Sequence, residues 1–175
     1  MDGTHTDSTV ITKELLNFLR ARFVLDWNGM HGAAHWGRVK LNGLSLAKET
    51  RANIRVVDLF AVLHDSCREN DQIDPEHGPR AAKLALTLQG QYFELTDEEL
   101  HLLQAACMGH THGTAHVDAT VCTCWDADRL DLWRVGIRPD PRRLLTVPAQ
   151  HIETIAAAVA RSEAWFQRRY GNPIS

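Results

Sequence analysis

The stretch FAVLHDSC, residues 60–67, ends an apolar run with a histidine and an aspartate side by side. The residues leading into it, from Val56 to Leu63, are apolar nearly all round, which is typical of a central helix buried on every side. A buried carboxylate is costly unless it has a partner. We therefore expect His64 and Asp65 either to have reached the surface or to share a bound cation.

Helical periodicity dominates the rest of the chain, and alternating strand patterns are nearly absent. Asp74 followed by Pro75 predicts a helix start capped by the aspartate, and the sequence from Thr96 to Glu99 predicts a capping box. We expect a single-domain, all-α bundle of about six to eight helices over residues 1–175, with its motif-bearing core at about 31–138. The expected helices lie at about 10–26, 31–50, 53–66, 74–88, 96 onward, 119–135 and 148–170, with Ile152, Ile155, Val159 and Phe166 of the last facing inward.

Composition excludes several classes of protein. A net charge of −3 and a pI of about 6.3 do not indicate a surface for extended nucleic acid or for membranes. An apolar run of about 18 residues is absent, and the first ten residues lack the order of a signal peptide. We expect a cytoplasmic protein, free to form homo-oligomers, whose four cysteines (Cys67, Cys107, Cys122 and Cys124) are thiols.

A carboxylate interrupts the apolar face of the helix expected at 119–135. Val121, Trp125 and Asp128 fall on one stripe at helical spacing, whereas Asp126 belongs to a neighbouring stripe that can face solvent. Asp128 either pairs with an arginine, Arg129 or Arg134, or joins other polar groups in the interior.

Polar residues interrupt apolar patterns on three expected helices. They are His35, His64, Asp65 and Asp128. Two imidazoles and two carboxylates are a usual donor set for a divalent ion such as Mn²⁺, Fe²⁺, Co²⁺, Ni²⁺ or Zn²⁺, and the set leaves Mg²⁺ open. One bound cation would offset the desolvation cost of all four groups. The sequence therefore predicts a metal site at the end of the central helix.

The order and spacing of these residues resemble the HD-domain superfamily of metal-dependent phosphohydrolases. The matching stretches are HGAAHWGRV (31–39), LHDSC (63–67), DPEHGPRAA (74–82) and DADRLDL (126–132). The resemblance implies an all-α fold with His35, His64, Asp65 and Asp128 as metal ligands, and Asp126 remains the alternative to Asp128. No GYP triplet follows the HD doublet, so the chain departs from the cyclic-di-GMP phosphodiesterase branch.

Further histidines lie between the HD doublet and the final aspartate, where some members of the superfamily hold a second metal. His77 and His110 occupy this interval and either bind that metal or contact phosphate or water. His31 is expected either to support a metal ligand without binding metal itself or to have a structural role. His112 and His116 are expected in a loop.

The activity that the resemblance implies is hydrolysis of a phosphoester or phosphoanhydride in a small phosphorylated molecule, expected to be a nucleotide. Asp65 could double as a base for the attacking water. Arg38, Arg80 and Arg129 are candidates to hold phosphate or, equally, surface ion-pair partners. Polar segments at 66–74 and 111–118 are expected to rim the pocket. The alternatives are an HD-type di-iron oxygenase, and a nucleotide-binding sensor that has lost catalysis.

Overall fold

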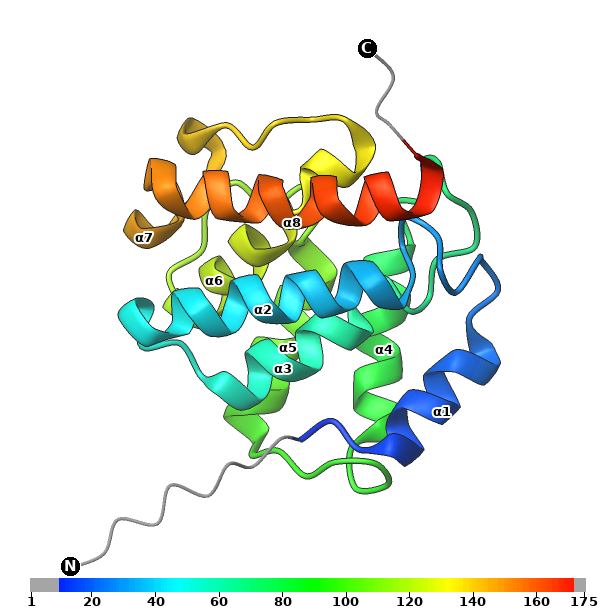
Figure 1. Cartoon of the computed structure of the whole chain (residues 1–175). Coiled ribbons are helices and arrows are strands. Elements are labelled where there is room, and N and C mark those ends of the chain that lie inside the picture. Colours follow the sequence, from blue (N-terminus) through cyan, green and yellow to red (C-terminus); the bar gives the residue numbers. More distant parts are fainter. Residues whose placement is uncertain (1–9, 172–175) are drawn as a thin grey trace, which may run out of the picture.

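The computed structural model describes residues 10–171. Of the first ten residues, which lack the order of a signal peptide, only Val10 is among the described residues. The described chain is all-helical, which confirms the expected fold class (Figure 1). Its α-helices are α1 (Lys13–Arg22), α2 (Ala33–Thr50), α3 (Ile54–Leu63), α4 (His77–Leu88), α5 (Asp97–Gly109), α6 (Ala119–Arg129), α7 (Val147–Gln150) and α8 (Ile152–Tyr170), with two 3₁₀ turns, η1 (Leu132–Val135) and η2 (Pro141–Arg143).

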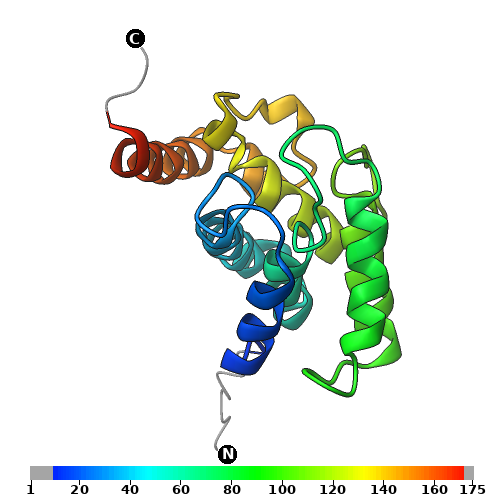
Figure 2. The same ribbon diagram turned by 90° about the vertical axis from the view of Figure 1, so that its right-hand side faces the viewer.

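The helices form successive layers (Figures 1 and 2). The α4–α5 pair packs on one side of α3, and α8 packs against α2 on the other side of the molecule. Helices α2, α3 and α6 contact one another between these outer elements. The end of α3 therefore lies where the other helices of the core meet.

Helix α3 is the expected central helix. Asn53 caps its N-terminus, where the side-chain Oδ1 accepts hydrogen bonds from the backbone nitrogens of Arg55 and Val56. Every residue from Val56 to Leu63 is buried, including Asp58, whose carboxylate lies 3.1 Å from Lys40 Nζ. His64 ends the helix and Asp65 follows it, and both are buried. The prediction that this doublet stays inside the protein is confirmed.

Two glycines allow close helix packing around this point. A Cβ at Gly43 of α2 would lie 2.5 Å from Val57 Cγ1 on α3 and 3.4 Å from Ala127 Cβ on α6. A Cβ at Gly78 of α4 would lie 2.5 Å from the carbonyl oxygen of Cys107 on α5. Real Cβ atoms do not approach so closely, so any larger residue would push these helices apart.

Several helix ends differ from those predicted. Helix α1 ends at Arg22 instead of about residue 26, and α2 begins at Ala33, so His31 lies in the preceding turn. Helix α4 begins at His77, not at Asp74. The Asp74 side chain accepts hydrogen bonds from Glu69 N and from Arg80 instead of capping the helix.

The C-terminal half also differs from the prediction. Helix α6 ends at Arg129 instead of about residue 135, and Leu132–Val135 form the separate 3₁₀ turn η1. The expected last helix breaks at His151 into α7 and α8, which leaves Ile152 70% exposed instead of inward. Ile155 and Val159 are buried as expected, and Phe166 is partly buried.

The predicted capping box and the predicted free thiols are confirmed. Thr96 and Glu99 form both hydrogen bonds of the capping box at the start of α5. All four cysteines are free. Within residues 10–171, no helix combines the length and apolar character needed to cross a membrane.

Candidate metal centre

Four of the predicted residues converge at the C-terminal end of α3. His35 extends from the first turns of α2, Asp128 from the last turn of α6, and His64 and Asp65 from the end of α3. His35 Nε2 lies 3.0 Å from His64 Nε2, 3.4 Å from Asp128 Oδ1 and 3.5 Å from Asp65 Oδ2. His64 Nε2 lies 3.7 Å from each of the same two carboxylate oxygens.

A second group of donors adjoins the first through Asp65. Its other oxygen, Oδ1, lies 3.3 Å from His77 Nε2 and 3.6 Å from His110 Nε2. These two nitrogens are 2.8 Å apart. The carboxylate of Asp65 thus faces both groups, one oxygen to each.

The outer nitrogen of each imidazole is bound to an acceptor. The acceptors are Asp131 Oδ2 for His35 at 2.7 Å, Phe60 O for His64 at 3.1 Å, Cys107 O for His110 at 2.7 Å and Asp74 O for His77. Carbonyl and carboxylate oxygens only accept, so each Nδ1 carries a proton, and any imidazole that is neutral presents an Nε2 lone pair inward. Two facing lone pairs cannot hydrogen-bond, so a proton or a cation must lie between the nitrogens of each pair.

The donor set fits divalent metal ions. Ligand atoms about 2.1 Å from a metal are about 3.0 to 3.4 Å from one another in octahedral or tetrahedral sites. The nitrogen and oxygen separations within the two groups cover 2.8 to 3.7 Å. An outward Nδ1–H bound to an oxygen is also the usual arrangement behind a metal-ligating histidine. The buried groups could therefore hold one ion each, His35, His64 and Asp128 the first and Asp65, His77 and His110 the second.

The charges at the centre favour a cation. Burial lowers the pKa of His64 to about 3, so its imidazole is neutral. Burial and Arg134 also lower the pKa of His35, but hydrogen bonds with Asp128, Asp131 and Asp65 outweigh them and raise it to about 9. His35 therefore carries the proton that lies between its Nε2 and that of His64 when no metal ion is bound. For Asp128, burial is outweighed by the hydrogen bond with His35, and the pKa falls well below its ordinary value. The carboxylates thus stay ionised.

Asp131 fixes the position of His35. Its carboxylate accepts hydrogen bonds from Arg38 Nε at 2.6 Å and from Ser162 Oγ at 2.5 Å, besides the one from His35. The Arg38 guanidinium in turn stacks on the Trp165 ring, 4.6 Å from its centroid. Helix α8, which carries Ser162 and Trp165, thereby supports a histidine on α2.

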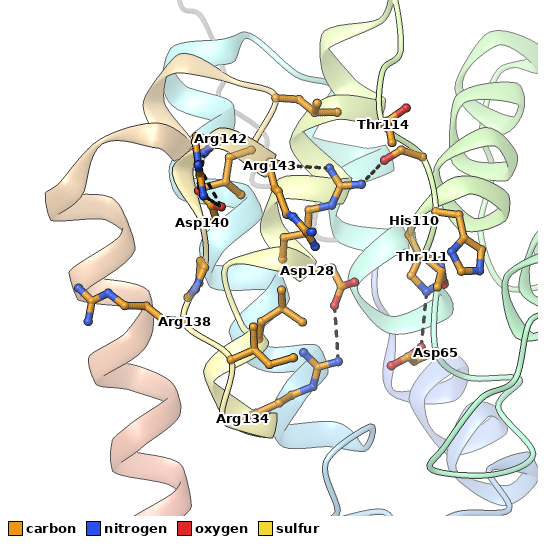
Figure 3. Close-up of a pocket in the computed structure, with 18 of the residues that line it drawn as sticks. Asp65, His110, Thr111, Thr114, Asp128, Arg134, Arg138, Asp140, Arg142 and Arg143 are labelled. Atoms are coloured by element: carbon orange, nitrogen blue, oxygen red, sulfur yellow. Dashed lines mark hydrogen bonds and ion pairs between the residues drawn. The ribbon is translucent and has the colours of Figure 1, made fainter.

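A cavity of about 860 Å³ opens onto the centre (Figure 3). Asp65, Asp128 and His110 lie at its inner end, and of the segment 111–118 that was expected at the rim, residues 111–114 form part of the wall. The 66–74 segment contributes only Arg68, and the segment 137–145, which the sequence did not indicate, forms the opposite wall. Figure 3 shows Arg134 pointing toward Asp128, with Arg134 Nη2 3.8 Å from the carboxylate.

The arginines predicted to hold phosphate are placed differently. Arg38 is buried and bound to Asp131, away from the cavity. Arg80 donates hydrogen bonds to the carbonyl oxygen of Cys67 and to the carboxylate of Asp74, and these contacts stabilise the 66–74 segment. Of the three, only Arg129 lines the cavity, where it donates to the carbonyl oxygens of residues 113 and 143.

His31 and Asp126 lie outside the donor groups. His31 Nδ1 lies 2.9 Å from Asp71 Oδ1 and contacts no ligand candidate by a hydrogen bond, because it precedes α2. The expectation that Asp126 can face solvent is wrong. It is fully buried and accepts hydrogen bonds from the backbone nitrogens of Leu145 and Thr146. Asp126 therefore anchors the chain before α7 and is not part of the centre.

Asp131 and Arg68 are site residues that the sequence did not indicate, whereas Arg134 was expected as a partner of Asp128 and lies beside it. Arg68 Nε lies 3.1 Å from Asp65 Oδ1. Asp131 and Arg68 each follow a predicted ligand by three residues, a spacing that returns to the same side of a helical turn. That spacing could have indicated Asp131, which stands in the quoted stretch DADRLDL.

Comparison of the chain with protein-family models, with curated proteins and with solved structures gives no match.

Proposed function

We propose that this chain is a metal-dependent phosphohydrolase of the HD type, acting on a phosphoester or phosphoanhydride of a nucleotide. The observation that carries the proposal is the set of four inward Nε2 atoms and two carboxylates at the inner end of an arginine-lined cavity. His35, His64 and Asp128 would hold one divalent ion, and Asp65, His77 and His110 would hold a second.

The chemistry that bound divalent ions supply is polarisation of phosphoryl oxygens and a lower pKa for coordinated water. The residues of the chain position the other reactants. Arg134 and Arg68 place guanidinium groups beside Asp128 and Asp65, at the inner end of the cavity, where they can orient phosphoryl oxygens.

The geometry favours a role in holding metal for Asp65 over the role of base that was expected from the sequence. Its Oδ2 faces His35 and His64, and its Oδ1 faces His77, His110 and Arg68. Burial alone would raise the pKa of this carboxyl, but the surrounding histidines, His64 first, hold it well below its ordinary value. We therefore propose that Asp65, with one oxygen toward each donor group, would help to hold the ions and would not accept a proton.

The metal content of the purified protein tests the proposal. We expect wild type to contain one or two divalent ions, and the His64→Ala and Asp65→Ala variants to lose most of them. His101→Ala, which removes an exposed histidine on α5, is the control and should keep the wild-type content. Equal metal content in all four proteins would contradict the proposal.

Phosphate release tests the reaction itself. Nucleotides and p-nitrophenyl phosphate esters would be assayed with Mn²⁺, Co²⁺, Ni²⁺ and Mg²⁺. We expect turnover with at least one pair of substrate and metal, and loss of that turnover in the His64→Ala variant. No phosphate release from any pair would exclude the proposed activity.

One observation also supports the second candidate, a di-iron oxygenase. Four histidines and two aspartates, with Asp65 shared, would supply ligands to two iron ions. The six arginines of the cavity favour a phosphorylated substrate and hence the hydrolase. Iron in the purified protein together with substrate-dependent oxygen consumption would support the oxygenase.

A further inference from the structure

The cavity over the metal centre has more positive charge than one phosphate group needs. Six arginines line it, against three aspartates, and two of these aspartates, Asp65 and Asp128, belong to the donor groups. The wall is therefore cationic even before any metal ion is added. A single phosphate monoester has at most two negative charges and would leave much of this potential unmatched.

Most of these arginines are held by other groups of the protein. The hydrogen-bonded or ion-paired ones are Arg68 with Asp65, Arg129 with the carbonyl of residue 143, Arg134 with the carbonyls of Met30 and Asp131, and Arg142 with Asp140. They shape the wall and set its potential.

Arg143 differs from them. Its guanidinium makes no hydrogen bond or ion pair within the described residues 10–171, and Figure 3 shows the side chain running from the 137–145 wall toward Asp128. Arg138, on the same wall, points away from the cavity in this view. Arg143 is thus the cavity arginine whose donors are free and directed inward.

The cavity has room for more than the reacting phosphate. Its volume of about 860 Å³ is that of a site for a whole small-molecule ligand. Arg68 lies beside Asp65 and Arg134 beside Asp128, and Arg143 approaches Asp128 from the 137–145 wall (Figure 3).

We infer that the substrate has a second phosphate group besides the one that reacts, and that Arg143 binds this second group. The inference rests on the proposed function for the identity of the reacting group. Arg143 would then determine specificity, because a planar guanidinium can bind phosphate through two parallel hydrogen bonds.

Calorimetric titrations with phosphonates test the inference independently of turnover, because their P–C bonds are not the ester bonds the enzyme would cleave. The probes are methylphosphonate, methylenediphosphonate and 1,3-propanediphosphonate, each at the same free Mn²⁺ concentration. We expect at least one diphosphonate to bind about 10- to 100-fold more tightly than methylphosphonate, the range of a charge-assisted hydrogen-bonded pair. The better diphosphonate tells whether the two phosphates are adjacent or separated.

Arg143→Gln should remove most of this preference. Arg142→Gln makes the same charge change at the neighbouring residue, whose guanidinium is bound to Asp140, and should keep it. Circular dichroism and metal content of both variants control for folding and for an intact centre. Equal affinities for all three phosphonates, or equal loss in both variants, would overturn the inference.

The outcomes separate this inference from the proposed function. A protein that hydrolyses phosphate esters but binds all phosphonates equally keeps the function and loses the second-phosphate site. A protein that prefers diphosphonates through Arg143 but releases no phosphate keeps the site and loses the hydrolase activity.

Discussion

Two aspartates on α6 that are separated by a single residue, Asp126 and Asp128, have different contacts. Asp128 faces the candidate metal centre, whereas Asp126 accepts hydrogen bonds from the backbone nitrogens of Leu145 and Thr146 and from the Thr146 hydroxyl. Both are surrounded by groups that need an acceptor, but only those around Asp128 include imidazole lone pairs that need a cation. We therefore expect Asp126 to contribute to stability and Asp128 to metal binding.

Replacing each aspartate by asparagine should show this separation. In Asp126→Asn the amide NH₂ would oppose N–H donors, and we expect unfolding to become easier by about 1 to 3 kcal/mol, with metal content unchanged. Asp128→Asn should lose at least half of the metal, and its free energy of unfolding should fall by less than that of Asp126→Asn. Urea unfolding and elemental analysis measure the two effects. A large loss of metal in Asp126→Asn would contradict the assignment.

Asp131 acts through His35. We expect Asp131→Asn to weaken metal binding by about 10- to 100-fold, because the amide no longer provides the charge that orients the imidazole. A competition titration with a chromophoric chelator measures the affinity. His151→Ala, at an exposed position between α7 and α8, is a control that should bind metal as wild type does. Wild-type affinity in Asp131→Asn would show that the contact is structural only.

At the scale of elements, the distance between α4 and α5 positions the second donor group. Gly78 packs against the carbonyl of Cys107, and His77 and His110 lie next to this contact. His110 follows Leu103 and Cys107 at helical spacing and His77 stands in the first turn of its helix, but neither position by itself indicates that the two side chains meet. Their proximity depends on how closely the two helices approach.

A methyl group at Gly78 should therefore separate the two histidines. We expect Gly78→Ala to cost about 1 to 3 kcal/mol of stability through overpacking and to lower the occupancy of the second ion more than that of the first. Gly37→Ala on α2 is the matched control, because a Cβ there meets no atom within 4 Å, and it should stabilise the protein slightly. Thermal unfolding and metal content check both variants. Equal metal content in the two would argue against this role for α4.

At the scale of the whole molecule, the side chains of the candidate metal centre come from most of the helices. Its donors and their immediate supports come from α2, α3, α4, α5, α6 and, through Ser162, α8. A ligand that binds these groups together only in the folded protein must stabilise that state.

Metal removal should thus lower the melting temperature. A divalent ion at about 100 times its Kd contributes about 2.7 kcal/mol, which corresponds to about 5 to 10 °C for a chain of this size. We expect prolonged chelation to lower Tm by this amount and metal addition to restore it. The His64→Ala variant should show no such shift. A chelator-insensitive Tm in protein known to have contained metal would contradict the coupling.

The sequence by itself determined the helical class, the buried helix α3 and the polar residues that interrupt its neighbours' apolar faces. These features depend on periodicity within one element, which local residue order specifies. Periodicity also selected Asp128 over Asp126 as the residue that faces the other donors. It could not say that Asp126 is buried, because its partners arrive from a distant backbone segment.

Only the tertiary structure decided which groups meet. The outward Nδ1 contacts, the support of His35 by Asp131 and α8, and the wall at 137–145 all join segments far apart in the chain. Such contacts depend on how closely helices approach and on where each ends, and shifts of a few residues in α4, α6 and α8 changed both. Arg38 and Arg80 illustrate the reason: their side chains are long enough to reach several acceptors, and packing determined which acceptor each one found.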